Sequence, residues 1–135
     1  MIPKISTLLL GSLFFFFQCQ APESTSNDIE DAKVKITIMY PNSEGKTFDM
    51  EYYKNQHMPM LADLFGDAMK GYKIDEGLSG RTPSDTIPFL AIGYLLFNSI
   101  EEYNAAFGPN AQQILGDIPN YTNIQPIVQI SKVVK

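Results

Sequence analysis

The residues best suited to chemistry lie in the segment FDMEYYKNQHMPM, residues 48–60, which contains His57, the only histidine in the chain. Imidazole changes charge near neutral pH, so it can accept or donate a proton under ordinary conditions. On a helix with 3.6 residues per turn, Tyr53 lies one turn before His57, on a face that also carries aliphatic side chains. This spacing favours acid–base chemistry in which His57 exchanges a proton with a bound ligand and Tyr53 orients the imidazole.

The same histidine also has a purely structural interpretation, in which its nitrogens bond a backbone carbonyl and a tyrosine hydroxyl inside the protein. Pro59 leaves the carbonyl of Asn55 without its helical donor, so we expect a kink or a new helix with Pro59 in its first turn. A kink would free a carbonyl near His57 that could fix its tautomer. A metal site is disfavoured because the chain has no second histidine and no cysteine cluster. A nucleophile–histidine pair is disfavoured because no serine elbow is present.

A second polar group of residues lies near the end of the chain, in GDIPNYTNIQP, residues 116–126. Asp117 and Asn123 are its candidates for binding a ligand. The alternative is ordinary turn chemistry, because asparagine and aspartate side chains often cap helices and close turns.

Composition narrows the class of protein. The chain has 135 residues, which suits one compact domain with a single core. Its formal net charge is −5, from 10 lysines and arginines and 15 acidic residues. No basic run is interleaved with aromatic residues, which argues against nucleic acid as a partner.

The first residues resemble an export signal. MIPK supplies one positive charge, and ISTLLLGSLFFFF is too short to span a membrane but suits a signal-peptide core. The apolar run ends at Cys19, the only cysteine, where a bacterial lipoprotein would be cleaved and lipidated. A signal of the ordinary secretory type or a simple hydrophobic anchor is the alternative. We expect a signal peptide over 1–18, a polar, flexible tether over 19–32, a folded domain over 33–135, and a location in the bacterial cell envelope with the lipid as the membrane anchor.

The folded part shows the patterns of four strands and two helices. Alternating apolar residues predict a strand over 34–40, and a continuous apolar run predicts a buried strand over 89–97. Short strands are expected from Gly71, with a bulge or bend at Gly77, and over 124–134, where Pro126 favours a strand start or an edge.

The two helices have recognisable ends. Asp49 or Thr47 can cap the helix that begins near residue 50. Ser99 and Glu102 form a capping box for the second helix, which we expect Gly108–Pro109 to break and Asn110 to restart. The order strand, helix, strand, strand, helix, strand is that of the ferredoxin-like α+β fold, βαββαβ. Helices cover one face of such a sheet, so we expect a second copy of the chain to cover the other and form a homodimer.

From about Val34 to Val134 the sequence resembles the EthD family, which is named for a protein linked to ethyl tert-butyl ether degradation. The features that carry the resemblance are FDMEYYKNQHMPM, the run GYLLF followed by SIEEY, and the closing GDIPNYTNIQPIVQI. The family implies a dimeric α/β barrel of two ferredoxin-like subunits. Proteins with similar sequences are often named reductases, and related barrels include lactone isomerases, polyketide cyclases or dehydratases, and cofactor-free monooxygenases.

The resemblance implies a pocket between helix and sheet that acts on a small hydrophobic or aromatic compound. Tyr53 and His57 match the family's helix motif and become the catalytic candidates, with Tyr52 beside them as a ligand-binding candidate. Asp117 and Asn123 match its tail motif. No glycine loop for a nicotinamide or flavin is visible, so no cofactor is expected. The other class of function is a membrane-tethered domain that binds a small molecule or a partner without catalysis.

Overall fold

The structure, a computed structural model, describes residues 32–135, so the predicted signal peptide, Cys19 and the predicted tether up to residue 31 lie outside the described part. The elements follow one another as β1 (Val34–Pro41), α2 (Met50–Tyr52), the π-helical turn η1 (Tyr53–His57), α3 (Met58–Phe65), the 3-10 turn η2 (Gly66–Ala68), β2 (Met69–Glu76), β3 (Phe89–Phe97), α4 (Ile100–Asp117), the 3-10 turn η3 (Ile118–Asn120) and β4 (Ile127–Lys132). Every strand and helix that the sequence predicts is present. Within residues 32–135 the helices are too short or too polar to cross a membrane.

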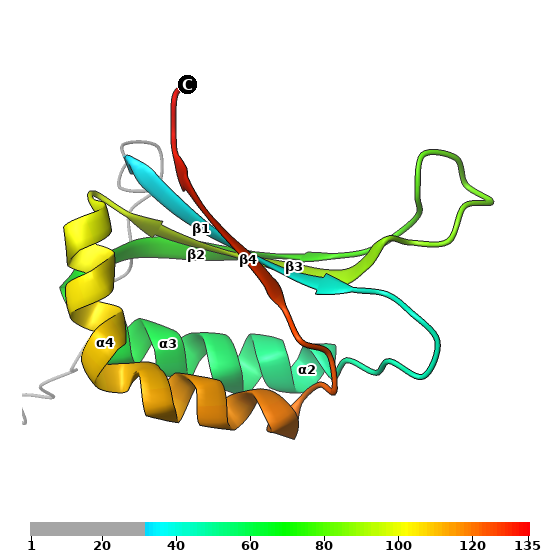
Figure 1. The fold of residues 1–135 in the computed structure, drawn as a ribbon, viewed down its shortest axis with the longest axis horizontal. Helices are drawn as coiled ribbons and strands as arrows, with labels where there is room; N and C mark the ends of the chain where they lie inside the picture. Colours follow the sequence, from blue (N-terminus) through cyan, green and yellow to red (C-terminus); the bar gives the residue numbers. More distant parts are fainter. Residues whose placement is uncertain (1–31) are drawn as a thin grey trace, which may run out of the picture.

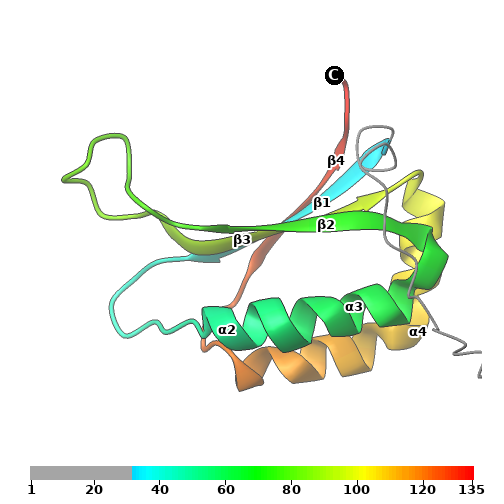
Figure 2. The same cartoon turned by 180° about the vertical axis from the view of Figure 1, so that it is seen from behind.

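The four strands form one antiparallel sheet in the order β2-β3-β1-β4, which is the ferredoxin-like arrangement that the sequence predicts. Figures 1 and 2 show that the helices lie on the same side of this sheet and leave its other side without a helical layer. β4 begins directly after Pro126 and lies at the edge, as expected for a strand that starts next to a residue without an amide hydrogen.

The core lies between the sheet and the helices. Paired residues of neighbouring antiparallel strands share a face, so Tyr40 with Ala91 and Ile36 with Leu95 point toward the helices. These four residues are buried, together with Leu61 and Phe65 of α3 and Ile114 of α4. Burial of this apolar surface is the main favourable term that holds the fold together.

The helix that carries His57, called the histidine helix below, consists of α2, η1 and α3 and contains Pro59. Asp49 caps it, with Oδ1 accepting from the Tyr52 amide at 3.0 Å. The helix then widens into the π-helical turn η1, in which the Met58 amide donates to the Tyr53 carbonyl. Pro59 follows in the first turn of α3, where its missing amide hydrogen costs little. The predicted alternative of a helix that starts with Pro59 in its first turn is therefore confirmed, and the π-helical turn η1 joins that helix to α2.

Helix α4 is continuous from Ile100 to Asp117, so the predicted break at Gly108–Pro109 is wrong. The helix instead bends sharply within its length, as Figure 1 shows. Asn110 does not restart it: the Asn110 side-chain amide donates to the Ala106 carbonyl at 2.8 Å and to the Leu64 carbonyl of α3 at 3.4 Å. The bond to Leu64 ties α4 to α3 next to the bend. The start of α4 is as predicted, with Ser99 Oγ accepting from the Glu102 amide at 3.1 Å.

The predicted irregularity at Gly77 also needs correction. The register of β2 shifts between Met69 and Gly71, at the other end of the strand. Gly77 comes directly after β2, and a side chain there would overlap the carbonyl oxygen of Phe89. Glycine is needed at Gly77 for a close backbone approach and not for a bulge.

Candidate functional site

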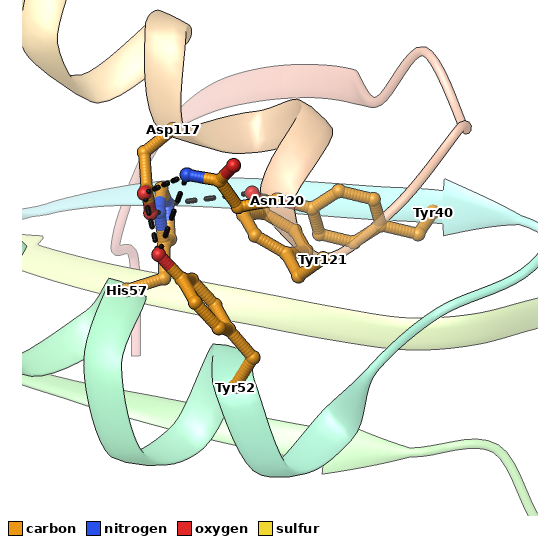
Figure 3. A network of polar contacts seen from close by, with 6 residues as sticks. All are labelled: Tyr40, Tyr52, His57, Asp117, Asn120 and Tyr121. Atoms are coloured by element: carbon orange, nitrogen blue, oxygen red, sulfur yellow. Dashed lines mark hydrogen bonds and ion pairs between the residues drawn. The ribbon is translucent and has the colours of Figure 1, made fainter.

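His57 lies at the centre of a hydrogen-bonded network that joins η1 to the end of α4 and the tail (Figure 3). Its Nδ1 is 2.7 Å from Oδ2 of Asp117, the last residue of α4. Its Nε2 is 3.3 Å from the Tyr121 hydroxyl, which is 2.8 Å from the Tyr40 hydroxyl of β1. Only 3% of His57 is exposed, so these protein groups supply the surroundings of its ring.

This geometry assigns the tautomer of His57. A carboxylate accepts hydrogen bonds only, so Nδ1 carries the hydrogen and Nε2 has the free lone pair. Tyr121 then donates to Nε2, and Tyr40 donates to Tyr121. The expectation that a carbonyl freed by Pro59 fixes the tautomer is wrong, because Asp117 is the partner of Nδ1 and the π-helical turn accommodates the proline.

The charges of the network follow from burial and hydrogen bonding. Burial lowers the pKa of His57, and the hydrogen bond and charge of Asp117 oppose this only in part. Burial would raise the pKa of Asp117, but hydrogen bonds from His57, Asn120 and Tyr52 outweigh it and lower that pKa below its ordinary value. The site at neutral pH is therefore a neutral imidazole beside an ionised carboxylate. Burial also raises the pKa of the Tyr40 and Tyr121 phenols, so both remain protonated donors.

Asp117 collects three donors. Besides His57, its Oδ1 accepts from the Tyr52 hydroxyl at 2.8 Å and from Asn120 Nδ2 at 2.8 Å. A negative charge is unfavourable at a helix C-terminus, where the last carbonyls already carry partial negative charge. These donors compensate for that position, and the structure thus brings together three of the predicted site residues, namely Tyr52, His57 and Asp117.

Tyr53 also lies at the site, but it contacts His57 through its ring. The two rings stack with centroids 5.4 Å apart and planes 16° apart. Tyr53 is fully buried, and its hydroxyl has no hydrogen-bond partner among residues 32–135. That hydroxyl occupies the space that a side chain at Gly93 of β3 would need. Tyr53 therefore orients the imidazole by stacking, and its ring lies between His57 and the sheet.

Asn123 does not join the network. Its Oδ1 accepts from the Thr47 amide and its Nδ2 donates to the Gly45 carbonyl, each at 3.0 Å. Beside it, the Thr122 hydroxyl donates to the Thr47 carbonyl at 2.7 Å. These bonds hold the tail against the loop before α2 across 75 to 78 positions of the chain, so they are long-range contacts and not the local turn chemistry considered as the alternative.

Sequence reasoning missed Tyr40, Asn120 and Tyr121 as members of the site. Alternation along β1 does place Tyr40 on the face toward the helices, and the other two lie inside the polar tail segment. What no local pattern shows is that Tyr40 and Tyr121, 81 positions apart, meet beside the histidine.

An open cleft of about 1000 Å³ lies next to this network. Two residues of the network, Asn120 and Tyr121, belong to its wall, whereas His57 and Tyr53 do not. The remaining wall residues come from the loop before α2, from the start of the histidine helix, from β2 and from the tail; they are Thr47, Phe48, Asp49, Met50, Glu51, Lys54, Ile74, Glu76, Pro119, Thr122 and Asn123. In the part of the chain that the structure describes, no three His, Cys, Asp or Glu side chains are grouped to hold a metal ion.

The fold and the site define a ferredoxin-like α+β domain with a histidine–carboxylate pair behind a cleft. The sequence model of the EthD domain matches residues 44–125. The crystal structure of an EthD-like protein from Ralstonia eutropha JMP134 is 39% identical, covers 78% of this chain and 95% of its own, and superposes with a TM-score of 0.74. The chain belongs to the EthD family.

More distant structures share the fold. An EthD family protein from Bacillus halodurans C-125 is 17% identical, with a TM-score of 0.51, over 76% of this chain and 99% of its own. A hypothetical protein from Arabidopsis thaliana is 16% identical, with a TM-score of 0.54, over 82% of this chain and 97% of its own. No curated protein matches the chain.

Proposed function

We propose that the protein is a small-molecule enzyme of the EthD family that moves protons on a small hydrophobic or aromatic compound, with His57 as the base. The observation that carries the proposal is the hydrogen-bonded series Asp117–His57–Tyr121, which begins at a partly buried carboxylate and ends at a residue in the wall of the cleft. A base that is neutral at working pH and paired with a carboxylate resembles the general bases of many enzymes.

The proton transfer involves two hydrogens. As the Tyr121 oxygen accepts a proton from the ligand, the Tyr121 hydroxyl hydrogen passes to Nε2 of His57. The ligand thereby loses one proton, Tyr121 stays neutral, and His57 becomes an imidazolium beside the ionised Asp117. The carboxylate stabilises that imidazolium by an opposite charge and by the hydrogen bond from Nδ1.

Two reaction types complete this proton balance without another reactant. In an isomerisation, His57 returns the proton through Tyr121 to another atom of the same ligand. In a dehydration, the proton goes to a hydroxyl group that leaves as water. Both suit a carbonyl compound, because removal of a hydrogen next to a carbonyl gives an enolate that the reprotonated Tyr121 hydroxyl can stabilise by a hydrogen bond.

Access to the base requires a movement. Tyr121 is 3% exposed and its hydroxyl already contacts both Tyr40 and His57. A ligand in the cleft reaches that hydroxyl only when the ring of Tyr121, or the tail segment that carries it, shifts. The proposal therefore includes a small displacement of residues 119–123 on binding.

The proposal also includes a homodimer. On the side of the sheet without helices, the central strand β3 presents Leu90, Ile92 and Tyr94, which alternate with the residues that face the core. On the same side of the edge strand β4, Ile127 pairs with Met39 of β1 and is about half exposed. A second copy of the chain would remove this apolar surface from water.

The test is hydrogen–deuterium exchange at carbon. The protein is incubated in deuterated buffer with a panel of aromatic and cyclic ketones, and the loss of proton signals next to the carbonyl is followed by NMR. For a ketone that exchanges, His57→Gln is expected to slow the exchange by about 10²–10⁴-fold, and Tyr121→Phe and Asp117→Asn to slow it as well. The matched control is Tyr103→Phe, which changes a tyrosine that packs against Phe97 and Phe107.

A binding domain without catalysis is the second candidate. The observation in its favour is that other protein groups already satisfy the hydrogen-bonding atoms of His57 and Asp117. The same network can therefore have the structural role of holding α4 against the histidine helix. In that case His57→Gln lowers the melting temperature, and exchange per folded molecule stays at the wild-type level. That outcome would contradict the proposed enzyme.

A further inference from the structure

We propose that the cleft selects uncharged or cationic aromatic molecules and rejects organic anions. This inference rests on the proposed function only in taking the cleft as the place where the ligand binds. It concerns the charge of the ligand, which the proton-transfer chemistry of His57 leaves open.

The first argument is the balance of charge in the wall. Three carboxylates, Asp49, Glu51 and Glu76, line the cleft, and Lys54 is the only cation among the wall residues that the structure describes. The Lys54 amine lies 2.8 Å from Glu51 Oε1, so its charge is already paired. The hydrogen bond from Lys54 lowers the pKa of Glu51, which keeps this carboxyl ionised. The wall thus carries a net charge of −2, from three carboxylates and one amine.

The surroundings of the wall do not reverse this balance. The Asp117 carboxylate lies directly behind Asn120 and adds a negative charge to the same region. Lys46 lies outside the wall and donates to the carbonyl of the wall residue Asn123 at 3.3 Å, so its positive charge offsets the negative charge of Asp117 and the wall keeps its net charge of −2. A carboxylate or phosphate on the ligand would therefore enter a cleft whose wall is net negative and whose one cation, Lys54, is already paired.

The second argument is the apolar part of the wall. Phe48, Met50, Ile74, Pro119 and Tyr121 offer two aromatic rings and three aliphatic surfaces. Phe48 and Tyr121 are neighbours, with ring centroids 5.5 Å apart, so a planar ligand can extend an aromatic cluster that already exists. Apolar walls with a few polar groups are typical of sites for small organic ligands. An aromatic cation gains further, because rings attract positive charge.

The consequence can be measured as a preference between two ligands of one shape. Like charges repel across a partly solvated cleft. Salt weakens this repulsion with a screening length of about 10 Å, so the repulsion between more distant charges is largely lost. We expect an anionic ligand to bind roughly tenfold more weakly, or worse, than its uncharged counterpart at low salt. The difference in affinity between the anionic and the uncharged ligand should decrease as the salt concentration rises.

The experiment uses 2-naphthol and 6-hydroxy-2-naphthoate, which differ by one carboxylate. Both fluoresce, so binding is titrated directly at low and at high salt. Glu76→Gln removes one charge from the wall and keeps the shape of the side chain; it is expected to strengthen binding of the anion and to leave the uncharged probe unchanged. Glu101→Gln is the control, because it removes the same charge from an exposed position in the first turn of α4.

The outcomes separate this inference from the proposed enzyme, because the titrations are repeated with His57→Gln. A charge preference that persists in His57→Gln supports the inference whether or not ketone exchange depends on His57. Equal binding of the two probes overturns the inference, as does failure of both to bind. An equal response of the anion to Glu76→Gln and Glu101→Gln also overturns it, since net charge and not the cleft would then be responsible.

Discussion

The protonation of His57 links the candidate site to the stability of the protein. Burial lowers its pKa in the folded state, so the unfolded chain binds this proton more strongly than the folded one. The free energy of unfolding should therefore be highest above the ordinary histidine pKa of about 6.5 and should fall as the pH drops toward the folded-state value. Chemical denaturation between neutral pH and about pH 5 measures this, and the slope should be smaller in His57→Gln.

The assignment of that slope is simple because the chain has no other histidine. Asp117 acts in a lower range: its lowered pKa contributes stability above the ordinary aspartate value and loses it only in stronger acid. A slope that is identical in the wild type and His57→Gln would show that burial does not shift the pKa of His57.

At the residue scale, the sequence predicted the identity of the site better than its connections. His57 and Asp117 could be chosen because few side chains in two short motifs have useful chemistry, and the structure brings them to 2.7 Å. Asn123 satisfied the same criterion, yet its amide bonds the distant loop before α2 and not His57 or Asp117. The partner of Nδ1 was mistaken because it lies 60 positions away on another helix. Contacts of that kind depend on how α4 packs, which no local pattern contains.

At the element scale, the two prolines inside helices show why boundaries are harder to predict than elements. Capping residues act locally, and both predicted caps, at Asp49 and Ser99, are present. Pro59 and Pro109 also act locally, but the two helices accommodate them differently. The histidine helix has a π-helical turn before Pro59, and α4 bends within its length. A proline in the sequence signals an irregularity, but the pattern alone does not show which of these forms the irregularity takes.

Gly93 offers a test of how the sheet positions the site. It lies in the middle of β3, where glycine is ordinarily unfavourable, and Tyr53 fills the space beside it. Gly93→Ala is expected to destabilise the protein by about 1–3 kcal/mol, because the buried Tyr53 ring has no room to retreat. It should also slow ketone exchange, since the displaced ring pushes against His57.

Gly116 is the matched control for this substitution. It lies within α4 and nothing comes within 4 Å of the position that its side chain would take. Gly116→Ala should therefore stabilise the protein by about 0.5–1 kcal/mol through helix propensity. Melting curves of the two variants give the comparison, and equal effects would mean that the contact between Gly93 and Tyr53 is not tight in solution.

At the scale of the whole molecule, the uncovered side of the sheet predicts assembly. We expect the domain without its leader to be a homodimer with no stable folded monomer, because two helices shield only one side of a four-stranded sheet. Ile92→Lys, on the uncovered side of the central strand β3, should dissociate the dimer and unfold it at low protein concentration. Ile114→Val, in the core on the other side, is the control, since it should lower stability slightly and leave assembly intact. Sedimentation equilibrium decides: a compact, folded wild-type monomer at low micromolar concentration contradicts the prediction.

The last prediction concerns where this domain works. We propose that the mature chain begins at Cys19 and carries lipid there, because a short apolar run ends at the only cysteine and Pro22 blocks cleavage after Ala21. Residues 1–31 lie outside the described structure, so this proposal rests on the sequence alone. Loss of Lys4 with the leader would change the formal charge from −5 to −6, since 9 basic and 15 acidic residues remain. Intact mass of protein from the membrane fraction should give a chain that starts at Cys19 plus acyl groups.

The variant for this prediction is Cys19→Ala, which should move the protein from the membrane fraction to the soluble fraction, because a single unlipidated domain with a net negative charge has little affinity for an anionic bilayer surface. Ser24→Ala, a few residues further along, keeps the cysteine and should leave the protein with the membrane. A mature chain that starts at another residue, or an equal distribution of the two variants between the fractions, would refute lipidation at Cys19.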